Sequence, residues 1–336
     1  MTSRLRVFAP ATVANLGPGF DVLGLALERP GDVIEAELSA RPSLENVEIV
    51  EITGDGGALS KDPHENVASC SAADVLRRAR DSGHGAAQQQ GLRLWLHKQM
   101  PLASGLGSSG ASSAAGAVVA NELLGRPLSQ RDLLRCAMEG ERAACGSAHA
   151  DNVAPSLFGG IVLIRSYEPL EVVSLPVPAS LWIAVAHPHC ELSTSAARAL
   201  VTSHQFSIRE AVTNLGNLGA FVAALHAGDL ELLGRSVTDA LVEPLRARLI
   251  PAFAAVKAAA LAAGGLGCSI AGAGPSVFAF GSDETSANRT GAAMCETFRR
   301  AARLECDVYV GRVSRVGARV IEEMGGGGGD REDGKR

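Results

Sequence analysis

Lysine is scarce in this chain of 336 residues. Arginine supplies most of the 31 basic side chains, and the lysines are only Lys61, Lys98, Lys257 and Lys335. Acidic residues number 36, which gives a formal net charge of −5, and no run of basic residues is present. Proteins that bind nucleic acids or anionic membranes usually carry a basic patch. We therefore expect neither a nucleic acid nor a membrane as a partner.

Cysteine pairs with the spacing of a metal or redox motif are absent. The seven cysteines are scattered along the chain at positions 70, 136, 145, 190, 268, 295 and 306. Their odd number and the lack of a C-x-x-C pair argue against a disulfide framework or a zinc ribbon, and suit a reducing compartment. His187 and His189 lack a third ligand nearby, so they are expected to be ordinary surface or core histidines.

Long runs of large apolar residues are also absent. The segments 99–121 and 258–282 carry no charge, but they are rich in glycine and serine rather than leucine and isoleucine, which argues against a membrane span. The apolar stretch at the N-terminus is too short for a signal peptide and is interrupted by proline and asparagine. We therefore expect a cytoplasmic protein. Glycine-rich, uncharged backbone is instead suited to close approach of a ligand.

Strand-like and helix-like segments alternate irregularly along the chain. Short aliphatic runs predict strands at 5–9, 33–38, 47–52, 91–97, 160–164, 181–186, 276–281 and 306–313. Residues rich in alanine and leucine predict helices at 67–80, 109–124, 130–141, 195–200, 208–227, 230–237 and 253–263. The order is not a strict repeat of strand, helix and strand, so it favours the α+β class over a doubly wound parallel sheet.

The length predicts two domains, at roughly 100–200 residues each. Prolines break up residues 167–179, which makes this segment the best candidate for a domain crossing. The expected domains are residues 1–166 and 167–322. Residues 323–336 are expected to form a disordered tail, because the chain from Gly325 onward has no apolar residue to bury.

The first of three glycine-rich segments spans residues 10–21, directly after a predicted strand. Its glycines and prolines predict a tight turn that presents Asn15 and Asp21. An amide and a carboxylate at such a turn could hold an amine or a hydroxyl group. The alternative is an ordinary turn in which Asp21 caps a helix.

The second glycine-rich segment, residues 101–113, lies between a predicted strand and the predicted helix 109–124. Glycine allows successive backbone N–H groups to converge on an anion, and the helix N-terminus adds partial positive charge. No lysine follows, so the segment is not a Walker A loop, and no acidic residue stands where a dinucleotide-binding fold requires it. The segment favours phosphate binding, and the alternative is a serine-rich helix cap with small residues for close packing.

The third glycine-rich segment, residues 264–276, joins a predicted helix to the predicted strand 276–281. Its flexible backbone could be concave to a ligand. A plain helix C-cap followed by a turn would explain the first two glycines equally well. This segment alone does not decide between the two interpretations.

Together the three segments resemble the motifs of the GHMP kinase superfamily, and within it the homoserine kinase family is most similar. The resembling stretches are APATVANLGPGFDVLGLAL (9–27), PLASGLGSSGAS (101–112), EGERAACGSAHADNVAPSLFGG (139–160), STSAARAL (193–200), EPLRARLIP (243–251) and SIAGAGPSVFAF (269–280). The resemblance implies an α+β fold with an N-terminal half like ribosomal protein S5 domain 2 and a ferredoxin-like C-terminal half. It also implies transfer of a phosphoryl group from ATP to the hydroxyl of L-homoserine, a step toward threonine.

The resemblance implies one set of residues that bind ATP and a second set that binds Mg²⁺. The ATP-binding residues are expected to be Asn66, Lys98, Pro101, Leu102, Ala103, Ser104, Gly105, Leu106, Gly107, Ser108, Ser109, Gly110 and Ala111. The expected ligands of Mg²⁺ are Ser109 and Glu141, which offer the hard oxygen atoms that this ion prefers. The alternatives are that Asn66 only caps a helix, that Lys98 only ends a strand in solvent, and that Glu141 is one more exposed helix carboxylate.

Homoserine offers an ammonium, a carboxylate and a hydroxyl group. Asn15 and Asp21 suit the ammonium, and Arg198 and Arg246 suit the carboxylate, which a guanidinium can bind with two hydrogen bonds. Arg248, two residues beyond Arg246, is the competing assignment. By resemblance, the remaining substrate-binding residues are His149, Asn152, Thr194 and Gly272.

The expected catalytic residues are Ser109, Glu141 and Asn152. Homoserine kinases are thought to work without a dedicated base, by positioning the hydroxyl and stabilising the transferred group. Asn152 stands where mevalonate and galactose kinases place an aspartate that takes the hydroxyl proton. Asp151 as a base is a further hypothesis, based on its adjacency to Asn152.

Three competing functions follow from the same sequence. Another GHMP kinase, acting on an alcohol such as mevalonate, would have no use for Asp21 as a counter-charge. A ligand sensor without turnover usually loses the metal ligand or a loop serine, yet Ser108, Ser109 and Glu141 are all present. A dinucleotide-binding oxidoreductase fails for lack of the acidic residue. A homodimer is a further possibility that the resemblance raises.

Overall fold

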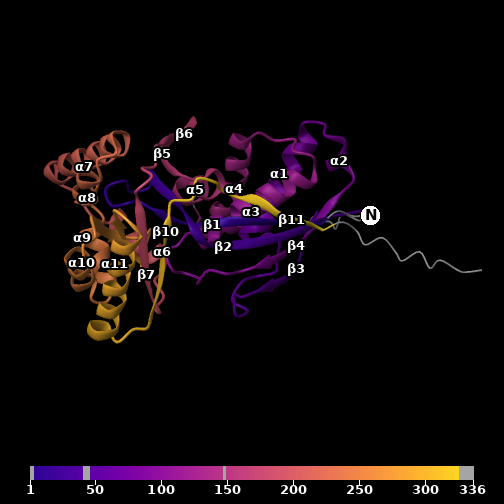
Figure 1. The fold of residues 1–336 in the computed structure, drawn as a ribbon. Coiled ribbons are helices and arrows are strands. Elements are labelled where there is room, and N and C mark those ends of the chain that lie inside the picture. The colour runs from indigo at the N-terminus through magenta and orange to yellow at the C-terminus, as the bar shows by residue number, and fades with distance from the viewer. Residues whose placement is uncertain (1–3, 41–45, 147–148, 325–336) are drawn as a thin grey trace, which may run out of the picture.

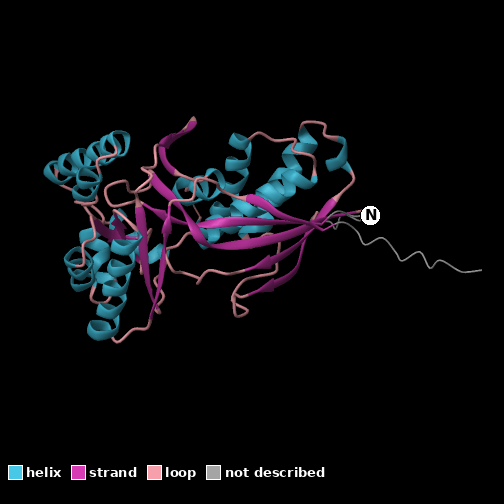
Figure 2. Ribbon diagram, viewed as in Figure 1, coloured by secondary structure: helices cyan, strands magenta, loops and turns pink. Residues whose placement is uncertain are grey.

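The computed structural model describes residues 4–40, 46–146 and 149–324, and its strands form two sheets (Figures 1 and 2). The larger sheet contains β1 (Arg4–Ala14), β2 (Leu23–Ser39), β3 (Val47–Thr53), β4 (Gly91–His97), β5 (Ile161–Tyr167), β6 (Leu170–Leu175) and β11 (Arg319–Met324). Its main path runs β11-β1-β2-β4-β3, with β5 pairing β2 and β6. The smaller sheet contains β7 (Trp182–Pro188), β8 (Gly267–Ile270), β9 (Val277–Gly281) and β10 (Cys306–Arg312), in the order β10-β7-β9-β8.

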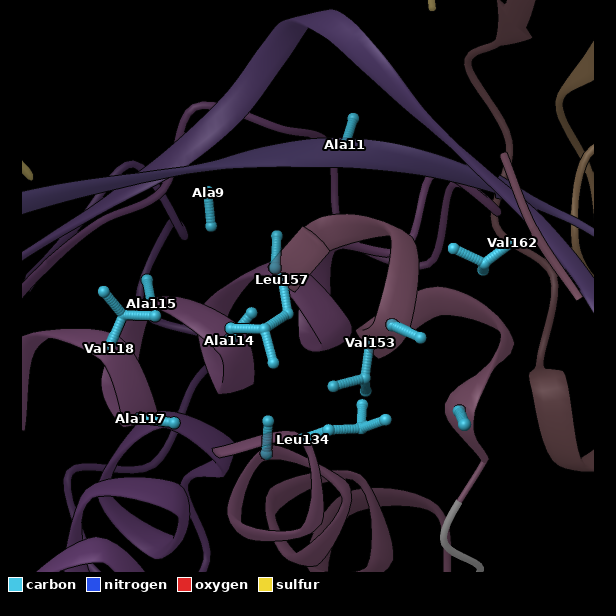
Figure 3. Close-up of a cluster of buried hydrophobic side chains, with 14 of the residues drawn as sticks. Ala9, Ala11, Ala114, Ala115, Ala117, Val118, Leu134, Val153, Leu157 and Val162 are labelled. Carbon is cyan, nitrogen blue, oxygen red and sulfur yellow. The ribbon is translucent and has the colours of Figure 1, made fainter. Parts of the chain in front are cut away.

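Five helices accompany the larger sheet, and α3 is the most buried among them. They are α1 (Val67–Asp81), α2 (Gly85–Gln88), α3 (Ser108–Leu123), α4 (Gln130–Cys145) and α5 (Ala150–Phe158). Figure 3 shows small side chains of α3, such as Ala114, beside Leu157 of α5 and beneath β1. Alanine and glycine allow this helix to lie close to its neighbours on all sides. The position of its N-terminus is therefore fixed by packing along its whole length.

The remaining helices belong to the C-terminal half of the chain. They are α6 (Thr194–Thr202), α7 (Ile208–Ala227), α8 (Leu230–Ser236), α9 (Glu243–Arg246), α10 (Phe253–Ala262) and α11 (Glu284–Thr297), with a 3₁₀ turn at Ala247–Leu249 and a π turn at Phe298–Ala302. A second hydrophobic core, which includes Val256, Met294 and Phe298, lies between α10, α11 and the smaller sheet. None of the helices in the described part of the chain combines the length and the apolar character that crossing a membrane requires.

The predicted α+β class is confirmed, and most predicted elements are present. Strand β2 is longer than the predicted strand 33–38, and β6, β8, β11, α5 and α11 were not predicted. Helix α11 illustrates the reason, because its polar and small residues give little hydrophobic periodicity. It begins instead at a capping box, in which Asp283 and Ser286 exchange hydrogen bonds between side chain and backbone.

The larger sheet includes strands from both predicted domains. Strands β6 and β11 both lie in the larger sheet, although they follow the boundary expected after residue 166. Glu323 and Met324 pair with β1 and are therefore not part of a disordered tail. Residues 325–336 lie outside the described residues. The division into domains at 1–166 and 167–322 stays a prediction.

One pair of cysteines forms a disulfide that the sequence analysis did not predict. Cys295 in α11 and Cys306 in β10 are bonded to each other. They are only 11 positions apart, and the turn after α11 brings the strand back along the helix. The scattered spacing of the cysteines gives no sign of this pairing, because helix α11 itself was not predicted.

Candidate active site

The three glycine-rich segments meet at one place in the structure. The amide of Gly272 donates to the carbonyl of Ala14 at 3.2 Å, and the side chain of Asn15 donates to the carbonyl of Gly272 at 2.8 Å. The amide of Ser276 donates to the carbonyl of Ser104 at 3.3 Å. Backbone hydrogen bonds therefore join the first segment to the third and the third to the second. Two adjoining cavities lie around this junction.

The first cavity has a volume of about 350 Å³ and lies at the N-terminus of α3. Gly107 precedes the helix with φ of +66°, and a Cβ atom there would lie 2.0 Å from Thr12 Oγ1. Only glycine fits this position, because both the conformation and the space exclude a side chain. The backbone N–H groups and the partial positive charge of the helix end make this cavity suitable for an anion such as phosphate.

Most of the predicted ATP-binding residues line this cavity. Those that do are Asn66, Lys98, Leu102, Ala103, Ser104, Gly105, Gly107, Ser108 and Ser109. Pro101, Leu106, Gly110 and Ala111 are not among the lining residues. Leu106 and Ala111 are instead fully buried in the hydrophobic core, where they hold the loop and the helix in place.

Lys98 lies in a buried polar cluster. Its ammonium pairs with Asp32 and donates to Ser112 Oγ at 2.7 Å and to the carbonyl of Ser108 at 3.2 Å. Ser108 Oγ also donates to Asp32, at 3.1 Å. Lys98 is therefore not a solvated strand end, and all three of its N–H groups are used. The cluster fixes the first turn of α3 beneath the phosphate-sized cavity.

Asn66 occupies the N-cap of α1 and also lines the first cavity. Its Oδ1 accepts from the amide of Ala68 at 3.1 Å, and its Nδ2 donates to the carbonyl of Ser60 at 3.0 Å. The cap alternative is therefore correct as a description of these bonds. It leaves open a contact with the nucleotide, because the residue forms part of the cavity wall.

Ser109 and Glu141 form part of the wall of the first cavity, and Glu141 also lines the second. Glu141 is buried, with 6% of its surface exposed, so it is not an ordinary solvated helix carboxylate. A hydroxyl and a carboxylate offer hard oxygen donors that fit Mg²⁺. No group of three histidine, cysteine or acidic side chains that could hold a metal occurs among the described residues. A metal ion here would therefore draw most of its ligands from phosphate and water.

The second cavity, of about 370 Å³, contains all the predicted substrate-binding residues. Its walls include Asn15, Asp21, His149, Asn152, Thr194, Arg198, Arg246 and Gly272. It shares Glu141, Asn152, Thr194 and Gly272 with the first cavity, so the two spaces adjoin at these residues. Arg248 is exposed and does not line the second cavity, which places Arg246 and not its competitor at the site.

Asp21 and Arg198 form an ion pair in the second cavity. The guanidinium donates to the two carboxylate oxygens at 3.0 and 2.8 Å, an arrangement with two parallel hydrogen bonds. Asp21 has φ of +59°, and its amide donates to Asn15 Oδ1 at 3.1 Å. Asn15 thus holds Asp21 in a left-handed conformation that directs the turn into the cavity.

Arg246 lies beside this pair and is almost fully buried, with 3% exposure. It donates to the carbonyl of Gly272 at 3.0 Å, but its Nε has no hydrogen-bond partner among the described residues. Burial, followed by the neighbouring charge of Arg198, lowers the pKa of Arg246 from its usual value. A buried guanidinium with an unused donor favours an anionic ligand in the cavity.

Asn152 and Asp151 lie at the start of α5 and both line the second cavity. Asn152 Oδ1 accepts from the hydroxyl of Thr12 at 2.7 Å, which fixes the direction of its amide. Asp151 is buried, and its Oδ1 has no partner among the described residues. Burial, together with the nearby carboxylates of Asp21 and Glu141, raises the pKa of Asp151 to about 7.

Sequence reasoning missed several residues that shape the site. Phe20 lies near both arginines, with its ring centre 5.4 Å from the guanidinium of Arg198 and 5.1 Å from that of Arg246. The Tyr167 hydroxyl donates to the carbonyl of Asp21 at 2.8 Å. Thr12 and Phe20 lie inside the first glycine-rich segment, so their positions could have drawn notice. Tyr167 and Asp32 lie outside every motif and gave no signal.

Comparisons with known proteins define the class of this chain. The model of the GHMP kinases N terminal domain matches residues 66–160, and that of the GHMP kinases C terminal domain matches residues 221–300. The first match covers α3, and the second covers α10, α11 and two strands of the smaller sheet, β8 and β9. The chain has the fold of the GHMP kinases.

Relatives within this class narrow the assignment. The homoserine kinase of Chlorobium phaeobacteroides (strain BS1) is 46% identical over 316 residues, which cover 94% of this chain and 98% of the relative. That of Arabidopsis thaliana is 40% identical over 323 residues, 95% of this chain and 85% of the relative. The crystal structure of homoserine kinase from Cytophaga hutchinsonii has a TM-score of 0.88 at 50% identity, with coverage of 95% and 97%. The chain belongs to the homoserine kinase family of GHMP kinases.

Proposed function

We propose that this chain transfers the terminal phosphoryl group of ATP to the hydroxyl of L-homoserine, forming O-phospho-L-homoserine for threonine synthesis. The observation that carries the proposal is the pair of adjoining cavities. One lies at a helix N-terminus suited to phosphate, and the other contains a carboxylate and two arginines. Their shared wall at Glu141 and Asn152 is where the two substrates would react.

The charges of the second cavity match a zwitterionic amino acid. The ammonium of homoserine would pair with Asp21, and its carboxylate with Arg198 and Arg246. Binding in this way exchanges the internal pair between Asp21 and Arg198 for two pairs with the substrate, so neither half-buried charge is left uncompensated. Mevalonate lacks the ammonium and would leave Asp21 without this role.

Mg²⁺ fits the proposal through Ser109 and Glu141, whose oxygen atoms would hold it beside the phosphate groups. When bound, the ion neutralises charge on the phosphate oxygens. The helix N-terminus of α3 contributes in the same direction through its backbone N–H groups. Lys98 acts in this proposal as a positioning residue, because its donors hold the first turn of α3.

The hydroxyl of the substrate is positioned by Asn152 in this proposal, without a dedicated base. Thr12 fixes Asn152 by a hydrogen bond, which favours an orienting role. The alternative is that Asp151 accepts the hydroxyl proton. Asp151→Asn retaining near-wild-type kcat would exclude that alternative, whereas a large loss of kcat with unchanged KM would favour it.

A coupled assay of ADP release with Mg-ATP tests the proposed function. We expect turnover with L-homoserine to exceed turnover with mevalonate, galactose, L-threonine and L-serine. Turnover only with an alcohol that lacks an amino group would keep the kinase class and overturn the substrate assignments. Binding of ATP without turnover of any of these compounds would favour a sensor.

The cytoplasmic location and the homodimer remain proposals. They rest on the cysteine usage and on the family resemblance described above. Sedimentation equilibrium of the purified chain tests the dimer: a mass of about twice 34.6 kDa is expected, and a mass of one chain at micromolar concentration contradicts it.

A further inference from the structure

A third, larger cavity lies outside the active site. It is a groove of about 680 Å³ where the chain leaves β10 and passes to β11, and it shares no lining residue with the two cavities above. Figure 1 shows this yellow segment running from β10 past α5 to β11. Four arginines line the groove, namely Arg29, Arg312, Arg315 and Arg319, together with a single acidic residue, Glu28.

We call this cavity the arginine groove. The four arginines that line it lack acidic partners. Among the described residues none of the four forms an ion pair, although most other described arginines do so, as Arg93 does with Glu37 and Glu48. The carboxylate of Glu28 accepts from the backbone amide of Arg312 at 3.3 Å and pairs with none of the guanidinium groups. The groove is thus strongly positive on a chain whose net charge is −5.

The guanidinium groups are held in place by neutral contacts. That of Arg312 lies 5.0 Å from the ring centre of Trp182, and that of Arg319 lies 4.8 Å from the ring centre of Phe8. Stacking on an aromatic ring orients a guanidinium and leaves its N–H groups available for an anion. The two arginine side chains are therefore partly preorganised, and a ligand would lose less free energy in ordering them.

The backbone of the groove is also fixed, and it is joined to the active site through α5. The amide of Ser314 donates to Ala26 at 2.8 Å, and its carbonyl accepts from Gly160 at 2.6 Å. The amide of Ala318 donates to the carbonyl of Ser156, in the last turns of α5, at 2.7 Å. The first turn of the same helix carries Asn152 into the active site. A nine-residue helix thus has one end at each site.

We propose that the arginine groove is a regulatory binding site for a compact anion that carries several phosphate or carboxylate groups. Two or more guanidinium groups would bind such an anion through paired hydrogen bonds, which singly charged anions cannot satisfy together. Its occupancy restrains residues 314–318 and, through the bond from Ala318 to Ser156, the helix that positions Asn152. This proposal is independent of the identity of the substrate.

Isothermal titration of the ADP-saturated protein with inorganic tripolyphosphate, and separately with citrate, tests the site. ADP fills the phosphate cavity at α3, so binding elsewhere is measured. The test variant is Arg29→Gln/Arg315→Gln. These two arginines make no ion pair and no aromatic contact among the described residues, so their replacement breaks neither kind of contact. The control is Arg209→Gln/Arg303→Gln, which removes two exposed arginines elsewhere and changes the net charge equally.

We expect the test variant to bind at least one of the two anions about tenfold more weakly or worse, as removal of two charge-assisted contacts predicts. The control should change affinity by less than about twofold. The anion that shows the larger difference identifies the phosphate or the carboxylate class. Equal weakening in both variants, or no binding of either anion to the wild-type protein, would overturn the proposal.

Hydrogen exchange of the same samples tests the link to the active site. Saturating anion should slow exchange of the amides in 314–318 and in α5 of the wild-type protein, but not of the test variant. If the anion binds but exchange in α5 is unchanged, the regulatory part of the proposal is overturned and the proposal of a binding site still stands. These experiments measure no turnover. A negative result therefore contradicts the anion site and does not bear on the proposed homoserine kinase activity.

Discussion

The pair formed by Asp21 and Arg198 is the central feature of the site at the scale of single residues. Each side chain compensates the charge of the other. A zwitterion can replace both partners at once, whereas a ligand with a single charge would leave one of these half-buried groups without a partner. In the proposed function, the pair would therefore select for molecules that carry both an ammonium and a carboxylate.

Removal of either cavity arginine should weaken binding of the amino acid. We expect Arg198→Ala and Arg246→Ala each to raise the KM for L-homoserine roughly tenfold or more, because each loses charge-assisted hydrogen bonds to the carboxylate. The KM for ATP should change little. Arg248→Ala is the matched control, since Arg248 is exposed and lies outside the cavity. Steady-state kinetics with an unchanged KM for homoserine in the first two variants would contradict these roles.

Asp151 makes stability depend on pH. Its pKa is raised from 3.8 to about 7 by burial, so the folded protein holds the proton more tightly than the unfolded chain does. The stabilisation is complete below the unfolded pKa and is lost as the pH rises through about 7. Asp151→Asn stays neutral at every pH, so its Tm should gain on that of the wild type between pH 4 and pH 8. A Tm difference that is constant over this range would show that Asp151 does not titrate as argued.

The sequence alone could predict the residues of the site better than their contacts. Asp21 and Arg198 are separated by 177 positions, and they were assigned to opposite ends of the substrate. Their pairing depends on the arrangement of both halves of the chain, which no local pattern encodes. Asp32 was missed for the same reason, since it meets Lys98 only across two neighbouring strands, β2 and β4.

The N-terminus of α3 is the key element of the phosphate-sized cavity. Gly107→Ala should reduce ATP affinity and stability together, because a Cβ atom would collide with Thr12 and the backbone at +66° disfavours alanine. Gly125→Ala at the other end of the same helix is the control. It has φ of +79° but open space around its Cβ, so it measures backbone strain alone. Equal losses of ATP affinity in the two variants would contradict the role of Gly107.

The buried pair of Lys98 and Asp32 supports the same helix end. Lys98→Met should lower the free energy of unfolding by about 3–5 kcal/mol, because it leaves the Asp32 carboxylate buried without its counter-charge. The double variant Asp32→Asn/Lys98→Met should recover part of this loss, since no net charge then remains buried. Urea denaturation measures both, with Lys61→Met, at an exposed lysine, as the control. A double variant less stable than Lys98→Met would contradict the account.

Helices could be predicted where their packing requires a clear pattern of residues in the sequence. Helix α3 was expected at 109–124 and is observed at Ser108–Leu123, because its alanine-rich sequence is bounded by a glycine loop. Helix α5 was missed, although it carries Asn152, because its nine residues are short and include Pro155. The element that carries Asn152 was therefore less visible in the sequence than the element whose N-terminus forms the phosphate-sized cavity.

At the scale of the whole molecule, the site is formed where loops from both sheets meet. Gly272, between β8 and β9 of the smaller sheet, bonds to Ala14 and Asn15 at the end of β1. The α+β class followed from the order of elements, but the return of β11 to the larger sheet did not, because its pairing with β1 joins opposite ends of the chain. That return also forms the arginine groove behind α5.

Phosphorus NMR of the reaction with L-homoserine and Mg-ATP tests the central claim most directly. The account predicts a phosphomonoester signal that is split by the methylene protons of the former alcohol and grows in equal amount to ADP. This result would place the phosphoryl group on the hydroxyl of the amino acid. Release of inorganic phosphate alone, or no product signal while ATP binds, would contradict the claim that the adjoining cavities form a homoserine kinase site.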